Sequence, residues 1–408
     1  MKFSVLLPTR NRIDLLRYAI ESVRRQDYSD WEIVVSDNAS EEDVRGYVTS
    51  LGDSRIRYVR TESFVPVTEN WNNVLRHASG DYVLMLGDDD AIMGGYFREL
   101  AACIEQHDGP DVIYTDAYQF AYPNVIPGHA TAFIQRGYTE FLRGNFAAEP
   151  FWLDKVKAKE LVRKSMSFRV AFGFNMQHYL VSRKMVREIS RAGDFYQSPY
   201  PDYYAANALL LEASRILVVP HPLVVIGISP KSFGYYYFND KESEGDTFLN
   251  NVPEPDIRRR LERIVLPGSS MNSSWLYAME AVKRNFDRNG RMAISYRRYR
   301  FFQIYAVYVR SGIAGVRRLL PKLSVVELLV CFMLGIVMAL SKIIPLKKVR
   351  QTFWTGIFDL VGPHPRFDLK IREVPYRNIL EMIQSEGNRG VTVSAPSHEA
   401  GCAGTRMS

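Results

Sequence analysis

The amino-acid sequence predicts an α/β fold, in which a mixed sheet with a Rossmann-like nucleotide-binding half precedes a C-terminal helical region. Two observations support this prediction. Over the first 107 residues, short apolar runs alternate with amphipathic segments, and several runs end in polar turns. Beyond residue 250, this alternation gives way to basic and aromatic residues that lead into a long apolar stretch.

The N-terminal alternation predicts strands at 3–7, 31–35, 56–59 and 82–86 and helices at 14–25, 41–51 and 69–78. The first predicted helix has an apolar face made of Leu15, Leu16, Ala19, Ile20 and Val23. Strands that alternate with helices imply right-handed crossovers and parallel pairing. Ligands of such sheets bind beyond the carboxyl ends of the strands. The turns at 8–12, 36–39 and 87–90 should therefore open onto one edge and form a nucleotide site.

The last of these turns holds three consecutive carboxylates, Asp88, Asp89 and Asp90. Such a cluster repels itself unless a cation or a polar ligand lies against it. Mg²⁺ prefers oxygen ligands and is often held by one or two carboxylates plus substrate phosphates, and Mn²⁺ suits the same ligands. A plain polar turn, or an acidic helix start, is the competing interpretation.

Three segments resemble motifs of the family 2 inverting glycosyltransferases of the GT-A fold. They are Val5–Arg12, Ile33–Ser40 and Ala78–Asp90, and they occur in the order expected for the family. The resemblance implies a GT-A type sheet, a nucleotide-diphosphate sugar donor (usually a UDP-sugar) and Mn²⁺ or Mg²⁺ as cofactor. Many members carry an Asp where Gly87 stands, so the division of roles among the three carboxylates stays open.

The resemblance also implies roles for single residues. The predicted nucleotide-sugar contacts are Pro8, Thr9, Arg10, Arg12, Asp37, Asn70, Asp88, Asp89 and Lys231. Asp37 would hydrogen-bond the base. Asp90 would hold the metal on the diphosphate, and Asp88 is the second predicted metal ligand. Lys231 follows the predicted strands 216–220 and 223–228, in a loop that often closes over the diphosphate in related enzymes.

An acceptor hydroxyl needs a general base on the opposite face of the sugar, and family resemblance expects an Asp or Glu at a helix start well after the metal motif. Asp202 fits best, because Pro201 suits a first helical turn and aromatic residues surround the pair. The alternative is that Asp202 is only a carboxylate at a helix start, where the helix dipole favours it. Asp116, expected to close the strand 112–115, is the competing candidate, with a structural or acceptor-binding role favoured.

The chain is expected to divide into a catalytic domain (1–250), a helical and basic membrane-associated region (251–387) and a disordered tail (388–408). Within the catalytic domain, 1–107 would bind the nucleotide sugar and 108–250 the acceptor. The net charge of +7 conceals an asymmetry, because residues 256–350 hold nineteen Lys and Arg but five Asp and Glu. The apolar stretch 323–344 is borderline for a spanning helix, and an interfacial or re-entrant anchor or a buried helix are its other interpretations.

These features predict an inverting, metal-dependent glycosyltransferase at the cytoplasmic face of the inner membrane. Its expected acceptor is a lipid-linked saccharide of a bacterial surface polysaccharide, and an anionic membrane surface is its expected partner. Nucleic acid is not an expected partner, because no recognised nucleic-acid-binding module is present. Three scattered cysteines suggest a reducing compartment. A nucleotidyltransferase and a membrane scaffold with a degenerate sugar-nucleotide domain are the alternatives. The first would carry a Gly-rich loop after the first strand, and the second would not need all three carboxylates.

Overall fold

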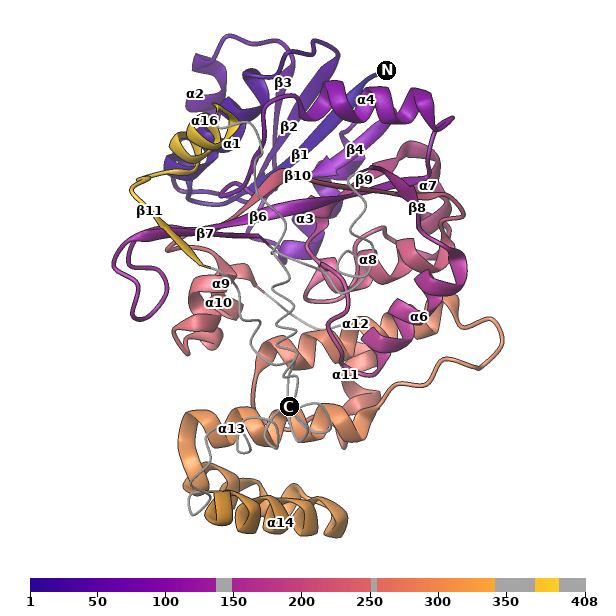
Figure 1. Ribbon diagram of the computed structural model, residues 1–408, viewed down its shortest axis with the longest axis vertical. Coiled ribbons are helices and arrows are strands. Elements are labelled where there is room, and N and C mark those ends of the chain that lie inside the picture. The colour runs from indigo at the N-terminus through magenta and orange to yellow at the C-terminus, as the bar shows by residue number, and fades with distance from the viewer. Residues whose placement is uncertain (137–148, 251–254, 342–370, 389–408) are drawn as a thin grey trace, which may run out of the picture.

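The computed structural model describes residues 1–136, 149–250, 255–341 and 371–388, and one sheet runs through it (Figure 1). Its strands are β1 (Phe3–Thr9), β2 (Trp31–Asp37), β3 (Ile56–Arg60), β4 (Tyr82–Met85), β5 (Ala91–Ile92), β6 (Val112–Ala121), β7 (Ala132–Arg136), β8 (Phe151–Trp152), β9 (Tyr179–Ser182), β10 (Ile216–Ile228) and β11 (Arg372–Val374). The order along the main path is β11-β7-β6-β9-β4-β1-β2-β3, and β10 pairs with β5, β6 and β8.

The two halves of the sheet differ in strand direction. Strands β3, β2, β1 and β4 are parallel, as the N-terminal alternation predicts. Strand β9 then lies antiparallel between β4 and β6, and β7 and β11 continue the antiparallel edge. Strand β10 runs parallel to β6 along the whole length of β6. The predicted mixed sheet is confirmed.

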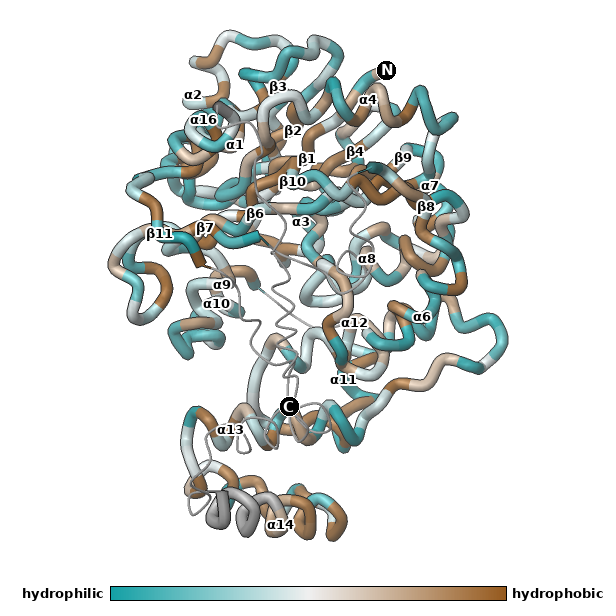
Figure 2. Tube along the Cα trace, viewed as in Figure 1, coloured by the Kyte–Doolittle hydropathy of each residue, from teal (hydrophilic) through white to brown (hydrophobic). Residues whose placement is uncertain are grey.

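Helices connect and follow these strands, and some of them cover both faces of the sheet. They are α1 (Ile13–Arg24), α2 (Val44–Ser50), α3 (Val67–Arg76), α4 (Tyr96–Gln106), α6 (Lys155–Met166), α7 (Arg183–Ile189), α8 (Pro201–Glu212), α9 (Phe233–Phe238), α10 (Glu242–Leu249), α11 (Pro255–Leu261), α12 (Ser270–Phe286), α13 (Tyr296–Leu319), α14 (Val325–Ser341) and α16 (Ile379–Asn388). Side chains of β1 alternate between two cores, since Val5 and Leu7 pack with α1, α2 and α4 while Leu6 packs with α3, α6 and α8. Figure 2 shows the apolar residues concentrated in the central strands.

Two strand predictions differ from the structure. Residues 216–228 form one strand instead of two, because β10 stays paired with β6 across Pro222 through a local register shift. Strand β6 also continues to Ala121, so Asp116 lies inside it and does not close it. Its carboxylate is buried and accepts a hydrogen bond from Arg136 Nε at 2.6 Å. Of the two roles that the sequence favoured for Asp116, structural or acceptor-binding, this ion pair supports the structural one.

The C-terminal region begins as predicted with helices, and α13 and α14 lie far from the sheet at the lower end of Figure 1. Gly312, with φ of 59°, kinks α13. The chain then returns to the sheet, where β11 pairs with β7 and α16 packs beside α1. This return was not expected within the helical region. Within the described residues, no helix has both the length and the apolarity that crossing a membrane requires. Residues 342–344 of the predicted apolar stretch and 389–408 of the predicted tail lie outside the described residues.

Candidate active site

A cavity of about 190 Å³ lies at the carboxyl ends of β1 and β4, where the parallel half of the sheet meets α8 and α10. The predicted site residues that line it are Pro8, Thr9, Arg10, Arg12, Asn70, Asp88, Asp89, Asp90 and Asp202. These residues come from β1, α3, the turn after β4 and the start of α8. The expected composite site is therefore assembled from segments that lie far apart in the sequence.

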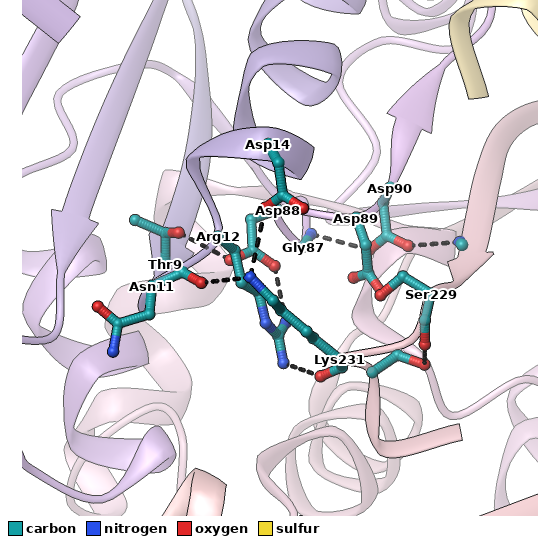
Figure 3. A network of polar contacts seen from close by, with 12 residues as sticks. Thr9, Asn11, Arg12, Asp14, Gly87, Asp88, Asp89, Asp90, Ser229 and Lys231 are labelled. Atoms are coloured by element: carbon teal, nitrogen blue, oxygen red, sulfur yellow. Dashed lines mark hydrogen bonds and ion pairs between the residues drawn. The ribbon is translucent and has the colours of Figure 1, made fainter. Parts of the chain in front are cut away.

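Asp88 lines the cavity and is held by residues at the end of β1 and in the turn after it (Figure 3). Its two oxygens accept hydrogen bonds from Thr9 Oγ1 at 2.7 Å and from Arg12 at 2.8 Å. Arg12 also donates to the Lys231 carbonyl oxygen and lies over the ring of Phe248. Burial alone would lower the pKa of Arg12, but Asp88 and Asp89 outweigh this effect and raise it. Arg12 therefore carries a permanent positive charge into the cavity.

Asp89 and Asp90 are also buried, and their charges repel each other. Burial raises the pKa of Asp89 to about 6, and the adjacent Asp88 charge adds to the rise. Burial and the Asp89 charge raise the pKa of Asp90 well above its ordinary value. Asp89 accepts a hydrogen bond from Ser229 Oγ at 2.8 Å. A cation placed beside these carboxylates would relieve their repulsion.

Two glycines allow Asp90 to be enclosed by backbone. The N–H groups of Gly87 and Gly227 each donate to its carboxylate at 2.8 Å. A Cβ on Gly87 would lie 2.5 Å from Asp90 Oδ2, and one on Gly227 would lie 1.9 Å from the carbonyl oxygen of Asp89. Gln177 donates to the same Oδ2 at 2.6 Å. Gly87, the departure from the family motif, thus makes room for a buried Asp90.

The carboxylates fit a divalent cation bound together with a diphosphate. No group of three His, Cys, Asp or Glu side chains suited to a metal ion is found in the described part of the chain. A magnesium ion that is shared with phosphates needs only one or two protein carboxylates, however. Asp88 and Asp90 remain the predicted ligands. Because both oxygens of Asp90 already accept hydrogen bonds, Asp89, with one side-chain donor, is a further candidate.

Asp202 lines the same cavity as the acidic turn and lies in the first turn of α8, as predicted. Its Oδ1 accepts a hydrogen bond from the backbone N–H of Met176 at 2.8 Å. Burial raises the pKa of Asp202 to about 7, although that backbone donor opposes the rise. A carboxylate with a pKa near neutral pH is suited to accept a proton during catalysis.

Two predicted contacts do not line the cavity. Asp37 is fully buried, and its carboxylate accepts hydrogen bonds from Tyr58, Arg60 and the backbone N–H of Ser40. The adjacent Asn38 lines the cavity instead. The ammonium group of Lys231 points to the Asn11 carbonyl oxygen at 2.8 Å and to Asp14 at 3.5 Å (Figure 3). A role for either residue toward a donor stays a prediction.

Further residues line the cavity and were not predicted from the sequence, among them Gln177, Tyr200, Phe248 and Leu249. Gln177 Oε1 and the Tyr200 hydroxyl are buried at the cavity without a hydrogen-bond partner in the described part of the chain. Such atoms are available to a polar ligand. Nothing in the sequence marks Gln177, because its partner Asp90 is 87 positions away. The run of aromatics around Tyr200 was the only signal for that residue.

The buried Arg12–Asp88 pair leads to a prediction about stability. Arg12→Met should lower the free energy of unfolding by about 3–5 kcal/mol, because it leaves Asp88 buried and unpaired. Chemical denaturation measures this loss. Arg10→Met is the matched control, since Arg10 also lines the cavity but donates to the Asn38 carbonyl oxygen. The double variant Arg12→Met/Asp88→Asn should regain part of the loss. Equal losses of stability in Arg12→Met and in the control Arg10→Met would contradict the prediction.

The mixed sheet, with an acidic cavity at the carboxyl ends of its parallel strands, has the architecture that the resemblance to proteins of the GT-A class predicts. Residues 4–163 match the model of glycosyl transferase family 2. The predicted resemblance and the predicted fold are confirmed.

Several relatives are similar over part of the chain. The GalNAc(5)-diNAcBac-PP-undecaprenol beta-1,3-glucosyltransferase of Campylobacter jejuni is 42% identical over 24% of this chain, and the match spans 33% of that protein's length. The putative colanic acid biosynthesis glycosyl transferase WcaA of Escherichia coli is 28% identical over 59% of this chain and 81% of its own. The UDP-Glc:alpha-D-GlcNAc-diphosphoundecaprenol beta-1,3-glucosyltransferase WfgD of Escherichia coli is 23% identical, over 57% and 96%.

Among solved structures, residues 1–349 of S. aureus TarS are 17% identical, with a TM-score of 0.44. The match covers 78% of this chain and 89% of that one. A similarity at this level carries no functional detail.

Proposed function

We propose that the protein is an inverting glycosyltransferase that moves a sugar from a nucleotide-diphosphate sugar to an acceptor hydroxyl. The observation that supports it best is the meeting of Arg12, the acidic turn and Asp202 in one cavity. Arg12 and the acidic turn suit a charged diphosphate, and Asp202 suits an incoming hydroxyl. The match of residues 4–163 to glycosyl transferase family 2 makes glycosyl transfer the expected chemistry for this arrangement.

In the proposed reaction, Asp202 accepts the proton of the acceptor hydroxyl, while the oxygen of that hydroxyl forms a bond to the anomeric carbon. The bond from that carbon to the diphosphate oxygen breaks, and the electron pair leaves with the nucleoside diphosphate. Arg12 lies where it can contact the developing negative charge. A Mn²⁺ or Mg²⁺ ion held by Asp88 and Asp90, with Asp89 as a further candidate, would stabilise the same charge as a Lewis acid.

The cavity must enlarge to admit such a donor. Its volume of about 190 Å³ is below the roughly 300–1,000 Å³ of ordinary ligand sites. Phe248 and Leu249, at the end of α10, form part of its wall. We propose that this end of α10 moves outward when the donor binds.

The names of the relatives support the finer parts of the proposal. WfgD carries UDP-Glc in its name, which supports a UDP-sugar as donor. Undecaprenol diphosphate in the names of two relatives supports a lipid-linked saccharide as acceptor. An enzyme with such an acceptor would work at a membrane surface, and we place it at the cytoplasmic face of the inner membrane.

A screen of nucleotide sugars with the purified protein tests the activity. The expected result is release of a nucleoside diphosphate from one UDP-sugar, at a rate that depends on added Mn²⁺ or Mg²⁺ and rises with a lipid-linked saccharide. Release of inorganic pyrophosphate from a nucleoside triphosphate and a sugar phosphate would favour a nucleotidyltransferase instead. Failure of every nucleotide sugar to bind, by calorimetry with and without metal, would favour the scaffold.

A further inference from the structure

A second cavity, of about 620 Å³, lies between α6, α13 and α14 and shares no lining residue with the candidate active site. Its cationic lining residues are Arg163, Lys164, Arg169, Arg297 and Arg298, and the acidic one is Glu160. The backbone N–H of Ser295 donates to the Met166 carbonyl oxygen at 3.0 Å and holds the start of α13 against the end of α6. The cavity is therefore a fixed concave site of positive charge.

Most of this charge is not neutralised by the protein. Arg163, Arg169 and Arg297 are exposed, and none of them forms an ion pair in the described part of the chain. Lys164 pairs with Glu160 at 3.5 Å. Cations gathered in one concave surface raise the local potential and attract an anion. The cavity thus fits a ligand that carries at least one phosphate group.

The wall of this cavity continues into an exposed apolar surface. Phe301, Val326 and Val330 line the cavity itself. The open face of α14 consists of Val325, Val326, Leu329, Phe332 and Met333, each more than half exposed. Their spacing along the chain places them on one side of the helix, and Figure 2 shows apolar residues along the described part of α14. Charge and apolar surface therefore adjoin in one site.

A buried ion pair holds α14 in this orientation. Glu327 accepts hydrogen bonds from Arg300 at 2.5 and 2.9 Å, and both side chains are nearly buried. Glu327 also accepts from the Ser324 backbone N–H at 2.8 Å. The polar residues at the start of α14 are thus turned inward. The side that faces solvent is left apolar.

We propose that this second cavity binds the phosphate group of an anionic membrane phospholipid, while the open face of α14 contacts the acyl chains. A free phosphate would need the cations but not the adjoining apolar face, and a nucleic acid would not cover that face either. The inference rests on the proposed location at a membrane surface, and it does not depend on sugar transfer.

Vesicle binding by the full chain tests the proposal. The protein is expected to bind phosphatidylcholine vesicles that contain phosphatidylglycerol and to bind pure phosphatidylcholine weakly. Arg163→Ala/Arg297→Ala should weaken binding to the anionic vesicles about 30-fold at low salt, since each cation near an anionic surface contributes about 5-fold. Arg76→Ala/Arg187→Ala removes the same charge from exposed sites on α3 and α7 and should change binding far less. Equal losses in the two double variants, or equal binding to both vesicles, would overturn the proposal.

The apolar contribution and the source of the phosphate have their own readouts. Phe332→Ser should reduce the binding that survives high salt, because salt screens only the ionic part. Inorganic phosphate should raise the melting temperature less than a short-chain phosphatidylglycerol does. Equal stabilisation by both, with no effect of Phe332→Ser, would identify free phosphate as the ligand and overturn the lipid proposal. Donor hydrolysis without vesicles should be unchanged in all these variants, so failure of the lipid site and failure of the transferase are distinguishable.

Discussion

Asp202→Asn is expected to lower turnover about 10²–10⁴-fold, the usual contribution of a general base. The variant keeps the shape of the side chain and loses its ability to accept a proton. Donor affinity should change little, because the proposed contact of Asp202 is with the acceptor hydroxyl and not with the diphosphate. Steady-state rates at saturating donor, together with calorimetric donor binding, measure the two effects separately.

Asp116→Asn is the control for this experiment. Asp116 also has a pKa raised to about 6 by burial, but it pairs with Arg136 and does not line the cavity. Its replacement should affect stability and leave the pH dependence of turnover unchanged. A collapse of donor affinity in Asp202→Asn with normal turnover would make Asp202 a binding residue.

The raised pKa of Asp202 predicts how rate and stability depend on pH. A base with a pKa of about 7 is protonated below that pH, so turnover should fall about tenfold per pH unit in acid. The folded state holds this proton more tightly than the unfolded state, whose pKa is about 3.9. The favourable contribution of the protonated carboxyl is therefore complete below pH 4 and is lost as pH rises through 7. The thermal stability of Asp202→Asn relative to the native protein should rise over that interval.

Local patterns predicted the parts of the fold that depend on neighbouring residues. The alternation of apolar runs and amphipathic segments over residues 1–107 indicated the parallel strands. Each segment carries the apolar pattern of its own secondary structure, because one or both of its faces are buried. The prolyl helix start indicated α8 and with it the position of Asp202. Carboxyl ends of parallel strands share one edge, and this rule correctly placed Thr9, Arg12 and Asp88 in one site although they come from two separate turns.

Contacts between distant segments could not be read from such patterns. Gly227 reaches Asp90 across 137 positions, and nothing near Gly227 marks this pairing. Asp37 ends a strand, as Thr9 does, but Tyr58 and Arg60 of the neighbouring strand hydrogen-bond its carboxylate. The return of β11 to the edge of the sheet likewise depends on the open edge of β7 and not on the composition of residues 371–374.

When each of the three carboxylates of the acidic turn is replaced by Asn, the variants should differ in stability and in metal-dependent binding. Asp90→Asn should cost about 1–3 kcal/mol of stability, because an amide nitrogen in place of one oxygen leaves a buried backbone donor unsatisfied. Asp89→Asn should keep or raise stability, since it removes one of two buried and repelling charges. Thermal unfolding of the purified variants without added metal measures this difference.

Metal dependence should then distinguish ligation from support of the turn. Asp89→Asn, and Asp88→Asn to the extent that Asp88 also binds metal, should weaken nucleotide-diphosphate binding in the presence of Mn²⁺ and have little effect in excess chelator. A hard cation gains most of its binding from charged oxygen ligands, so the neutral amide of Asp89→Asn should lose that gain without disturbing the fold. Asp88→Asn also removes the buried partner of Arg12 and should cost stability as well. Asp90→Asn should weaken binding with and without metal, because it displaces the turn that Gly87 and Gly227 hold. Unchanged activity of the native protein in excess chelator would exclude the metal, and a loss in Asp90→Asn confined to Mn²⁺ would restore Asp90 as its principal ligand.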